Sequence, residues 1–186
     1  LPEGDQLTSL VIVARMERTG STGDALDVLA KRMASEKSED SPLLQLVYNS
    51  SHFTGEELRA LAHALSYNHQ SYRAANRVAQ RAAELLPDHP DCWRLLGYTE
   101  LHLKQLEESV AHFRKGLEKG NESSAWELAL ALAARGKEED LAEACELVKD
   151  ADSLSNLASY LANNTQSYHS ANQLAQRAVE LAPDNE

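Results

Sequence analysis

Seven histidines are the side chains of this chain most able to bind a metal ion or to transfer protons near neutral pH. Metal-binding histidines and cysteines recur at short, fixed spacings, as in H-E-x-x-H. No histidine here follows that pattern, and no cysteine stands at zinc spacing from one. We therefore predict no metal site and interpret these residues as solvated or packing histidines. They are His52, His63, His69, His89, His102, His112 and His169.

A second candidate for chemistry is the acidic run Glu138-Glu139-Asp140, because neighbouring carboxyl groups can serve as acid and base. The run falls where a helix is predicted to begin, and acidic side chains there oppose the positive end of the helix dipole. That structural role accounts for it. The chain also carries no G-x-S-x-G, phosphate-loop or dinucleotide-binding glycine pattern. We predict no catalytic residues, no cofactor site and a protein that is not an enzyme.

The overall charge limits the partners. The formal net charge is −11, so nucleic acid and anionic membrane surfaces would be repelled. No apolar run approaches the length of a membrane span, so no membrane insertion is expected. The two cysteines lie far apart and do not form a disulfide framework. They slightly favour the cytoplasm, but a periplasmic protein would look similar, and the compartment stays open.

An internal repeat is the clearest structural feature of the sequence. Residues 68–88 align without a gap on residues 164–184, at an offset of 96, and fourteen of the 21 positions are identical. A copy this close indicates that one structural unit was duplicated and stacked in an array. The bulk composition agrees with helices, since prolines and glycines are few and aromatic residues make up only 5%.

The unit is a pair of helices. A first helix is predicted over about residues 54–68, with Thr54 and Glu57 as the capping box T-x-x-E. A second is predicted over about residues 71–86, ended by Pro87. Both carry apolar or small residues at helical spacing. These are Leu58, Leu61, Ala62 and Leu65 in the first helix, and Ala75, Val78, Ala79, Ala82 and Leu85 in the second.

The next unit supplies a family resemblance. It opens at Pro90, and its first helix carries Trp93-x-x-Leu96-Gly97. Its second helix carries small, aromatic and small residues at Ser109, Phe113 and Gly116, and the period is 34 residues. This pattern resembles the tetratricopeptide repeat (TPR). In the flanking units the resemblance rests on the second helices and the prolines that follow: Ala75, Ala82 and Pro87, then Ala171, Ala178 and Pro183.

The resemblance implies an all-α fold, a right-handed superhelical solenoid of antiparallel helix pairs. We divide residues 54–186 into units of about 56–89, 90–123, 124–151 and 152–185. The third unit is six residues short, which predicts a truncated second helix and a change of superhelical pitch near residues 149–152. Residues 1–53 are expected to form a degenerate repeat: a helical pair over 5–18 and 23–35, a polar loop, and a short helix over 43–48.

Four aromatic residues are predicted to pack inside this array. Tyr72 and Tyr168 stand at equivalent places early in second helices, where the family commonly packs an aromatic ring between helices. Trp93 and Trp126 fall on the expected buried stripe of first helices.

The resemblance also implies a binding surface, because the first helices of TPR proteins line a concave groove that binds peptides. Asn side chains suit peptide amides and Tyr offers contact area with little rotamer entropy, and Arg94 could hold a carboxylate. A solvated polar groove without a ligand is the alternative. The family's carboxylate clamp is not expected, since Ala60 and Ala64 stand at its places. The groove positions are Tyr67, Asn68, Arg94, Tyr98, His102, Asn156, Tyr160, Asn163 and Asn164.

The leading functional hypothesis is therefore a non-catalytic scaffold that binds a peptide or helix of a partner protein. One alternative is a TPR module of a larger enzyme or of a secretion or assembly machine. Another is self-association through uncapped repeat ends, with apolar surface around Leu174 and Leu181. Since the sequence begins with Leu and stops where a further repeat would start, we expect it to be a processed or excised part of a longer protein.

Overall fold

The computed structural model describes residues 22–35, 41–49, 53–165 and 167–182, and no strand occurs in these ranges. The helices α2 and α3 precede the array, which then alternates between first helices and second helices. The elements are α2 (Thr22–Ser35), α3 (Pro42–Asn49), α4 (Gly55–Ser66), a 3₁₀ turn (His69–Ser71), α5 (Tyr72–Leu85), α6 (Pro90–His102), α7 (Leu106–Glu118), α8 (Ser124–Arg135), α9 (Glu138–Leu147), α10 (Ala151–Tyr160), a π-helical turn (Leu161–Thr165) and α11 (Tyr168–Leu181).

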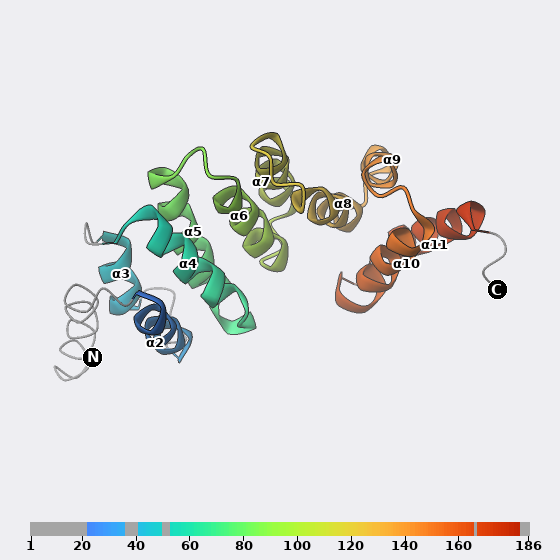
Figure 1. Ribbon diagram of the computed structural model, residues 1–186. Helices are drawn as coiled ribbons and strands as arrows, with labels where there is room; N and C mark the ends of the chain where they lie inside the picture. Colours follow the sequence, from blue (N-terminus) through green and yellow to red (C-terminus); the bar gives the residue numbers. More distant parts are fainter. Residues whose placement is uncertain (1–21, 36–40, 50–52, 166, 183–186) are drawn as a thin grey trace.

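The hairpins follow one another in chain order and form an arch (Figure 1). The first helices α4, α6, α8 and α10 lie along its lower, inner edge, and the second helices α5, α7 and α9 along its outer edge. The predicted all-α solenoid of helix pairs is confirmed. At the start of the array α2 packs on α4, and α3 packs on α5. The short helix predicted over 43–48 is present as α3, whereas the helix predicted over 5–18 lies outside the described residues.

The helix ends follow from local sequence. The predicted capping box is confirmed: Thr54 Oγ1 accepts a hydrogen bond from the Glu57 amide, and Glu57 Oε2 accepts one from the Thr54 amide. Pro90 occupies the first turn of α6, where a missing amide hydrogen costs nothing. Gly136 ends α8 in the left-handed conformation, with φ of 75°. Each boundary therefore has its own chemical cause.

The glycine of the TPR-like signature permits a close approach between α6 and α7. A Cβ placed on Gly97 would lie 2.7 Å from the Phe113 ring, which is fully buried. The Ser109 hydroxyl donates a 2.7 Å hydrogen bond to the Gly97 carbonyl across the same contact. Any larger residue at position 97 would push the two helices apart.

Second helices also pack on the first helix of the following unit, as α5 does on α6 and α7 on α8. The third unit breaks this rule. Its second helix, α9, ends at Leu147 after 10 residues, whereas α5 has 14, which confirms the predicted truncation. α9 makes no comparable contact with α10; instead, the last hairpin reaches the array where α11 contacts α8 and α9 and where the π-helical turn contacts α8. The packing thus changes where the unit is short. The change of superhelical pitch near residues 149–152 stays a prediction.

Two of the four aromatic packing predictions are wrong. Tyr72 is buried and Trp93 is half-buried, with its indole Nε1 donating to the Pro87 carbonyl. Tyr168 is 65% exposed, because no described helix follows α11 to cover it as α6 covers Tyr72. Trp126 is 37% exposed. It stands 33 residues after Trp93, one short of the period, and one residue turns a side chain by 100° around a helix.

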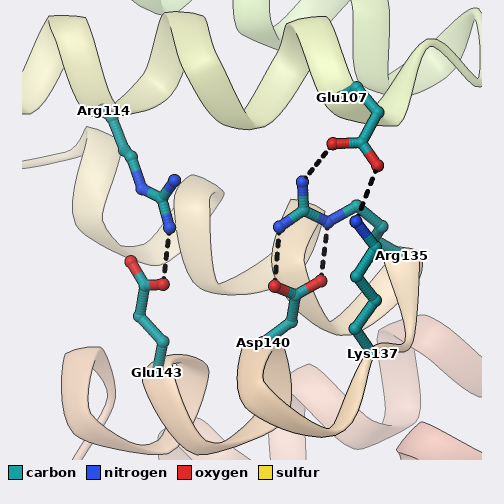
Figure 2. A network of polar contacts seen from close by, with 6 residues as sticks. All are labelled: Glu107, Arg114, Arg135, Lys137, Asp140 and Glu143. Carbon is teal, nitrogen blue, oxygen red and sulfur yellow. Dashed lines mark hydrogen bonds and ion pairs between the residues drawn. The ribbon is translucent and has the colours of Figure 1, made fainter.

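A polar network joins the second and third units near the truncated helix (Figure 2). Arg135, at the end of α8, binds Asp140 of α9 through two parallel contacts of 2.6 Å and also pairs with Glu107 of α7. Only 3% of the Asp140 side chain is exposed. The hydrogen bonds from Arg135 hold the pKa of Asp140 below its ordinary value. Asp140 therefore serves as a structural anchor, whereas Glu138 and Glu139 of the same acidic run are exposed.

We expect Asp140→Asn to lower the free energy of unfolding by about 3 kcal/mol, because it leaves the Arg135 guanidinium without its bidentate partner in a largely buried site. The matched control is Glu143→Gln, which removes a half-exposed pair with Arg114 and should cost less than about 1 kcal/mol. Urea unfolding of both variants measures the difference. Equal losses of unfolding free energy in the two variants would mean that the buried Arg135–Asp140 pair stabilises the fold no more than the half-exposed Arg114–Glu143 pair.

A candidate binding surface on the inner face

Aromatic rings from α5 and α6 form the first part of the candidate surface. The ring of His102 stacks on Tyr72, with a centroid distance of 4.3 Å and an interplanar angle of 2°. Tyr98 packs against the same histidine edge to face at 4.6 Å. Burial raises the pKa of Tyr72 to about 12, and the adjacent Tyr98 adds to the shift. The Tyr72 phenol therefore stays neutral near neutral pH, and its ring faces are apolar.

The last hairpin brings a second pair of rings to this surface. Trp126 of α8 and Tyr160 of α10 meet edge to face with centroids 6.2 Å apart. Burial raises the pKa of Tyr160, and the Tyr98 phenol adds to that effect. We call Tyr72, Tyr98, His102, Trp126 and Tyr160 the aromatic cluster. Its members come from α5 and from three successive first helices.

A row of alternating charges runs beside the aromatic cluster, across the beginnings of α4, α6 and α8. Arg59 pairs with Glu56 at 2.9 Å and approaches Asp91 of the next unit at 3.5 Å. Arg94 continues the row to Glu127, with 2.9 Å between Nη1 and Oε1. Arg94 was expected to be available for a partner's carboxylate. In the structure it is held by Glu127, and an incoming carboxylate must displace that contact.

Two polar atoms on this surface lack a hydrogen-bond partner among the described residues. His102 Nε2 and Glu127 Oε2 are both buried from solvent in this state. Burial lowers the pKa of His102 and raises that of Glu127, the latter against the opposing effect of Arg94. An unpaired buried polar atom costs about 1–3 kcal/mol. A ligand that donates hydrogen bonds at these two points would remove that cost, once the side chains that cover the two atoms move aside.

The other predicted groove residues lie apart from the aromatic cluster. Tyr67 is 75% exposed, and its hydroxyl lies 3.1 Å from His63 Nε2. The Asn68 side chain accepts a hydrogen bond from the Gln70 amide and so caps the 3₁₀ turn. Asn156 and Asn163 are exposed. The side chain of Asn164 lies outside the described residues. Of the nine predicted positions, Tyr98, His102 and Tyr160 thus gather in one place.

Two residues of the surface were missed from sequence: Trp126 was assigned to the core, and Glu127 was not considered. Tyr72 was predicted to pack between helices, and it is buried. The one-residue offset of Trp126 from the 34-residue period is the signal that could have placed it outside the core. The same offset puts Glu127 at the place that Trp93 occupies one unit earlier, within reach of Arg94. Nothing in the sequence alone indicates that this pair would form.

The described residues offer little for metal or thiol chemistry. Nowhere in the described ranges do three or more His, Cys, Asp or Glu side chains gather as a metal ion would require. Burial raises the pKa of Cys92 to about 11 and also raises the pKa of Cys145, so few of these thiols ionise near neutral pH. In the same part of the chain, no helix has the length and apolar character needed to cross a membrane.

Comparisons with known proteins place the fold. No family model matches the sequence, and no curated protein does. The solved structure of MamA MSR-1 C2 is 21% identical, covers 91% of this chain and 99% of its own, and superimposes with a TM-score of 0.56. An ArsTM double mutant of MamA RS-1 is 20% identical over 96% of both chains, with a TM-score of 0.50. The fold is that of a TPR solenoid.

Other comparisons add no further argument. YrrB, described as a TPR protein with an unusual peptide-binding site, is 15% identical over 94% of this chain and 93% of its own, with a TM-score of 0.47. The superpositions on the two MamA structures show a shared fold alone, and ligands have to be argued from the residues of this chain.

The buried state of His102 predicts a pH dependence of stability. Its pKa in the folded protein lies below the ordinary value of 6.5, so the unfolded chain binds more protons as the pH falls from 7 to 5, and stability decreases. His102→Phe keeps a ring on Tyr72 and removes the titrating group. We expect a smaller loss of unfolding free energy between pH 7 and 5, measured by urea unfolding.

The effect will not vanish completely, because burial lowers the pKa of His63 too. An unchanged pH dependence in His102→Phe would show that this histidine titrates in the folded protein as it does in the unfolded chain.

Proposed function

We propose that this chain is a non-catalytic scaffold that binds an extended peptide segment of a protein partner across the aromatic cluster, on the inner face of α6, α8 and α10. The observation that carries the proposal is the pair of unpartnered polar atoms, His102 Nε2 and Glu127 Oε2, beside aromatic rings from different repeat units. The backbone amides of an extended peptide supply hydrogen-bond donors of the required kind. The rings supply apolar area at low entropic cost.

The length of α6 gives the scale of the contact. His102 lies eight residues after Arg94 on α6, which corresponds to about 12 Å along the helix. Glu127 contacts Arg94 directly. Because an extended chain advances about 3.3 Å per residue, roughly four peptide residues would span the stretch from Arg94 to His102. Tyr67, Asn68, Asn156 and Asn163 are exposed and would extend the contact surface beyond this centre.

The charge on this face favours a donor-rich partner. Glu56, Asp91 and Glu127 outnumber Arg59 and Arg94 in the row of charges, and both arginines are already paired. The chain as a whole carries a formal net charge of −11. A neutral or basic peptide is therefore favoured over an acidic one.

Selection of random peptides displayed on phage tests the proposal even while the natural partner is unidentified. We expect peptides enriched on the unmodified protein to bind Trp126→Ser at least about tenfold more weakly, because truncating a central aromatic residue of an interface usually lowers the affinity by this much. The control is Tyr168→Ser, which removes another exposed aromatic ring, far along the chain on α11. Fluorescence anisotropy with the enriched peptides measures both affinities.

Trp126 is exposed enough for its removal to leave the fold intact, and the urea unfolding midpoint of the variant verifies this. Enriched peptides that bind both variants as well as the unmodified protein would place their site elsewhere. Failure to enrich any peptide would argue that this face is merely a solvated polar surface.

A further inference from the structure

A pocket of about 220 Å³ lies between the second helices α9 and α11. Two buried leucines, Leu141 at 8% and Leu174 at 1% exposure, are part of its wall. The residues from α9 stand at spacings of three, one and three, so they share one face of that helix. They are Glu138, Leu141, Ala142 and Cys145, and Gln173, Leu174 and Arg177 of α11 form the other wall.

Leu174 was expected to expose apolar surface at the repeat end. At 1% exposure it is buried, so that expectation is wrong for this residue. Its side chain instead contributes to the wall of the pocket. Leu181, the other residue of that expectation, is 45% exposed, and self-association stays a prediction.

The internal repeat provides a filled counterpart of the α11 wall. Gln173 and Leu174 correspond to Arg77 and Val78 of α5, at the offset of 96. The short helix α3 packs on α5, and the Arg77 guanidinium lies 5.5 Å from the centroid of the Tyr48 ring. Val78 is fully buried. The face that is covered on α5 therefore borders a pocket on α11.

The pocket stays open because α9 turns small side chains toward it. Ala142 is exposed and Cys145 is half-buried, and both side chains are too short to fill the space toward α11. On α3, by contrast, Leu44 and Val47 are larger and almost fully buried. An engineered cavity of about 150 Å³ holds benzene. The pocket between α9 and α11 therefore has room for one large apolar side chain.

The surroundings of the pocket are acidic. α9 has five acidic residues and no lysine or arginine, and two of the five are already paired with arginines of α7 and α8. Glu138, Glu139 and Glu146 are exposed, and Glu146 has only a loose contact of 3.9 Å with Lys149. On the other wall, Arg177 is paired with an acidic residue of its own helix at 2.7 Å. Charge complementarity therefore favours a cationic ligand.

We propose that the pocket between α9 and α11 docks a basic amphipathic helix of a partner protein. One large apolar side chain of that helix enters the pocket beside Leu141 and Leu174, and its lysines or arginines face the acidic residues of α9. A helix suits the site because residues three and four apart share one face, so an apolar anchor and its flanking cations point the same way. Glu138 and Glu146 are eight residues apart, about 12 Å along α9, which is about two turns of an incoming helix.

This site is independent of the proposed peptide site on the inner face. None of its lining residues belongs to the aromatic cluster, and none belongs to the row of charges that ends at Glu127. Variants of the pocket should therefore leave peptide binding on the inner face unchanged, and the two proposals can fail separately.

Selection from a phage library of helical peptides tests the proposal. The peptides share a cysteine-free, alanine-based scaffold of about 18 residues, long enough to form a helix in water, with one face randomised. We expect enriched peptides to carry a large apolar residue flanked by Lys or Arg. They should bind Ala142→Lys at least about tenfold more weakly, because the new side chain fills the pocket and repels cations.

The matched control is Ala111→Lys, which places the same side chain at an exposed alanine of α7 outside the pocket. It should leave the affinity unchanged. Fluorescence anisotropy measures the binding of labelled peptides to both variants. Ala142 is exposed, so its replacement should leave the urea unfolding midpoint nearly unchanged.

The thiol of Cys145 gives a second readout inside the pocket. It is half-buried, whereas Cys92 is 0% exposed, so a thiol reagent such as DTNB modifies Cys145 selectively in the folded protein. With enriched peptide on about nine-tenths of the sites, the modification should slow at least about fivefold, because only the unoccupied fraction reacts. Peptides selected for the inner face should leave the rate unchanged.

The proposal is supported if Ala142→Lys alone weakens binding and the enriched peptides protect Cys145. It is overturned if the library enriches no peptide or only acidic and uncharged ones, if the two variants bind alike, or if Cys145 is not protected. A modification rate that falls as the concentration of the unmodified chain rises, with no peptide present, would also overturn it, since the occupant would then be a second copy.

Discussion

The structure depends on one packing constraint: a second helix must be covered both by its own hairpin partner and by the first helix of the next unit. A two-helix unit is too small to bury its apolar surface alone, so neighbours complete each other's cores. The constraint explains the alanine-rich face of α5, where Ala75, Ala79 and Ala82 are fully buried. It also explains the glycine at position 97, which lets α6 approach Phe113 of its own partner.

The candidate binding surface arises where this constraint is relaxed. α9 is too short to pack against α10 as α5 packs against α6. The ion pairs of Arg135 instead join α7, α8 and α9. The last hairpin then contacts α8 through the π-helical turn and both α8 and α9 through α11, with Tyr160 of α10 beside Trp126 of α8. Rings from successive first helices meet on the inner face, and the polar atoms of His102 and Glu127 are left without partners there. A short second helix such as α9 can thus alter a surface to which several helix pairs contribute.

Features with local causes could be predicted from the sequence, whereas features set by neighbours could not. The helix boundaries, the Thr54 capping box and the short second helix α9 follow from period and capping chemistry, and all are observed. Tyr72 and Tyr168 are the same residue in nearly the same sequence, yet one is buried and the other 65% exposed, because among the described helices one follows α5 and none follows α11. From the sequence, Arg94 was expected to bind a ligand carboxylate. Its actual partner, Glu127, is 33 residues away in another unit, so nothing in the sequence indicates that Arg94 is paired within the chain. Whether a side chain on the face between two units is buried therefore depends on the neighbouring unit and not on its own local sequence.

Native-state amide hydrogen exchange tests this account most directly, because α5 and α11 supply near-identical sequences in two environments. The amides of Ala79, Arg81 and Ala82 are to be compared with those of Ala175, Arg177 and Ala178, which have the same residue identities. If coverage by the next unit sets helix stability, the α5 amides will be protected by a larger opening free energy and the α11 amides will exchange markedly faster. Equal protection of the two sets would contradict the account, since it would mean that each hairpin owes its stability to its own sequence.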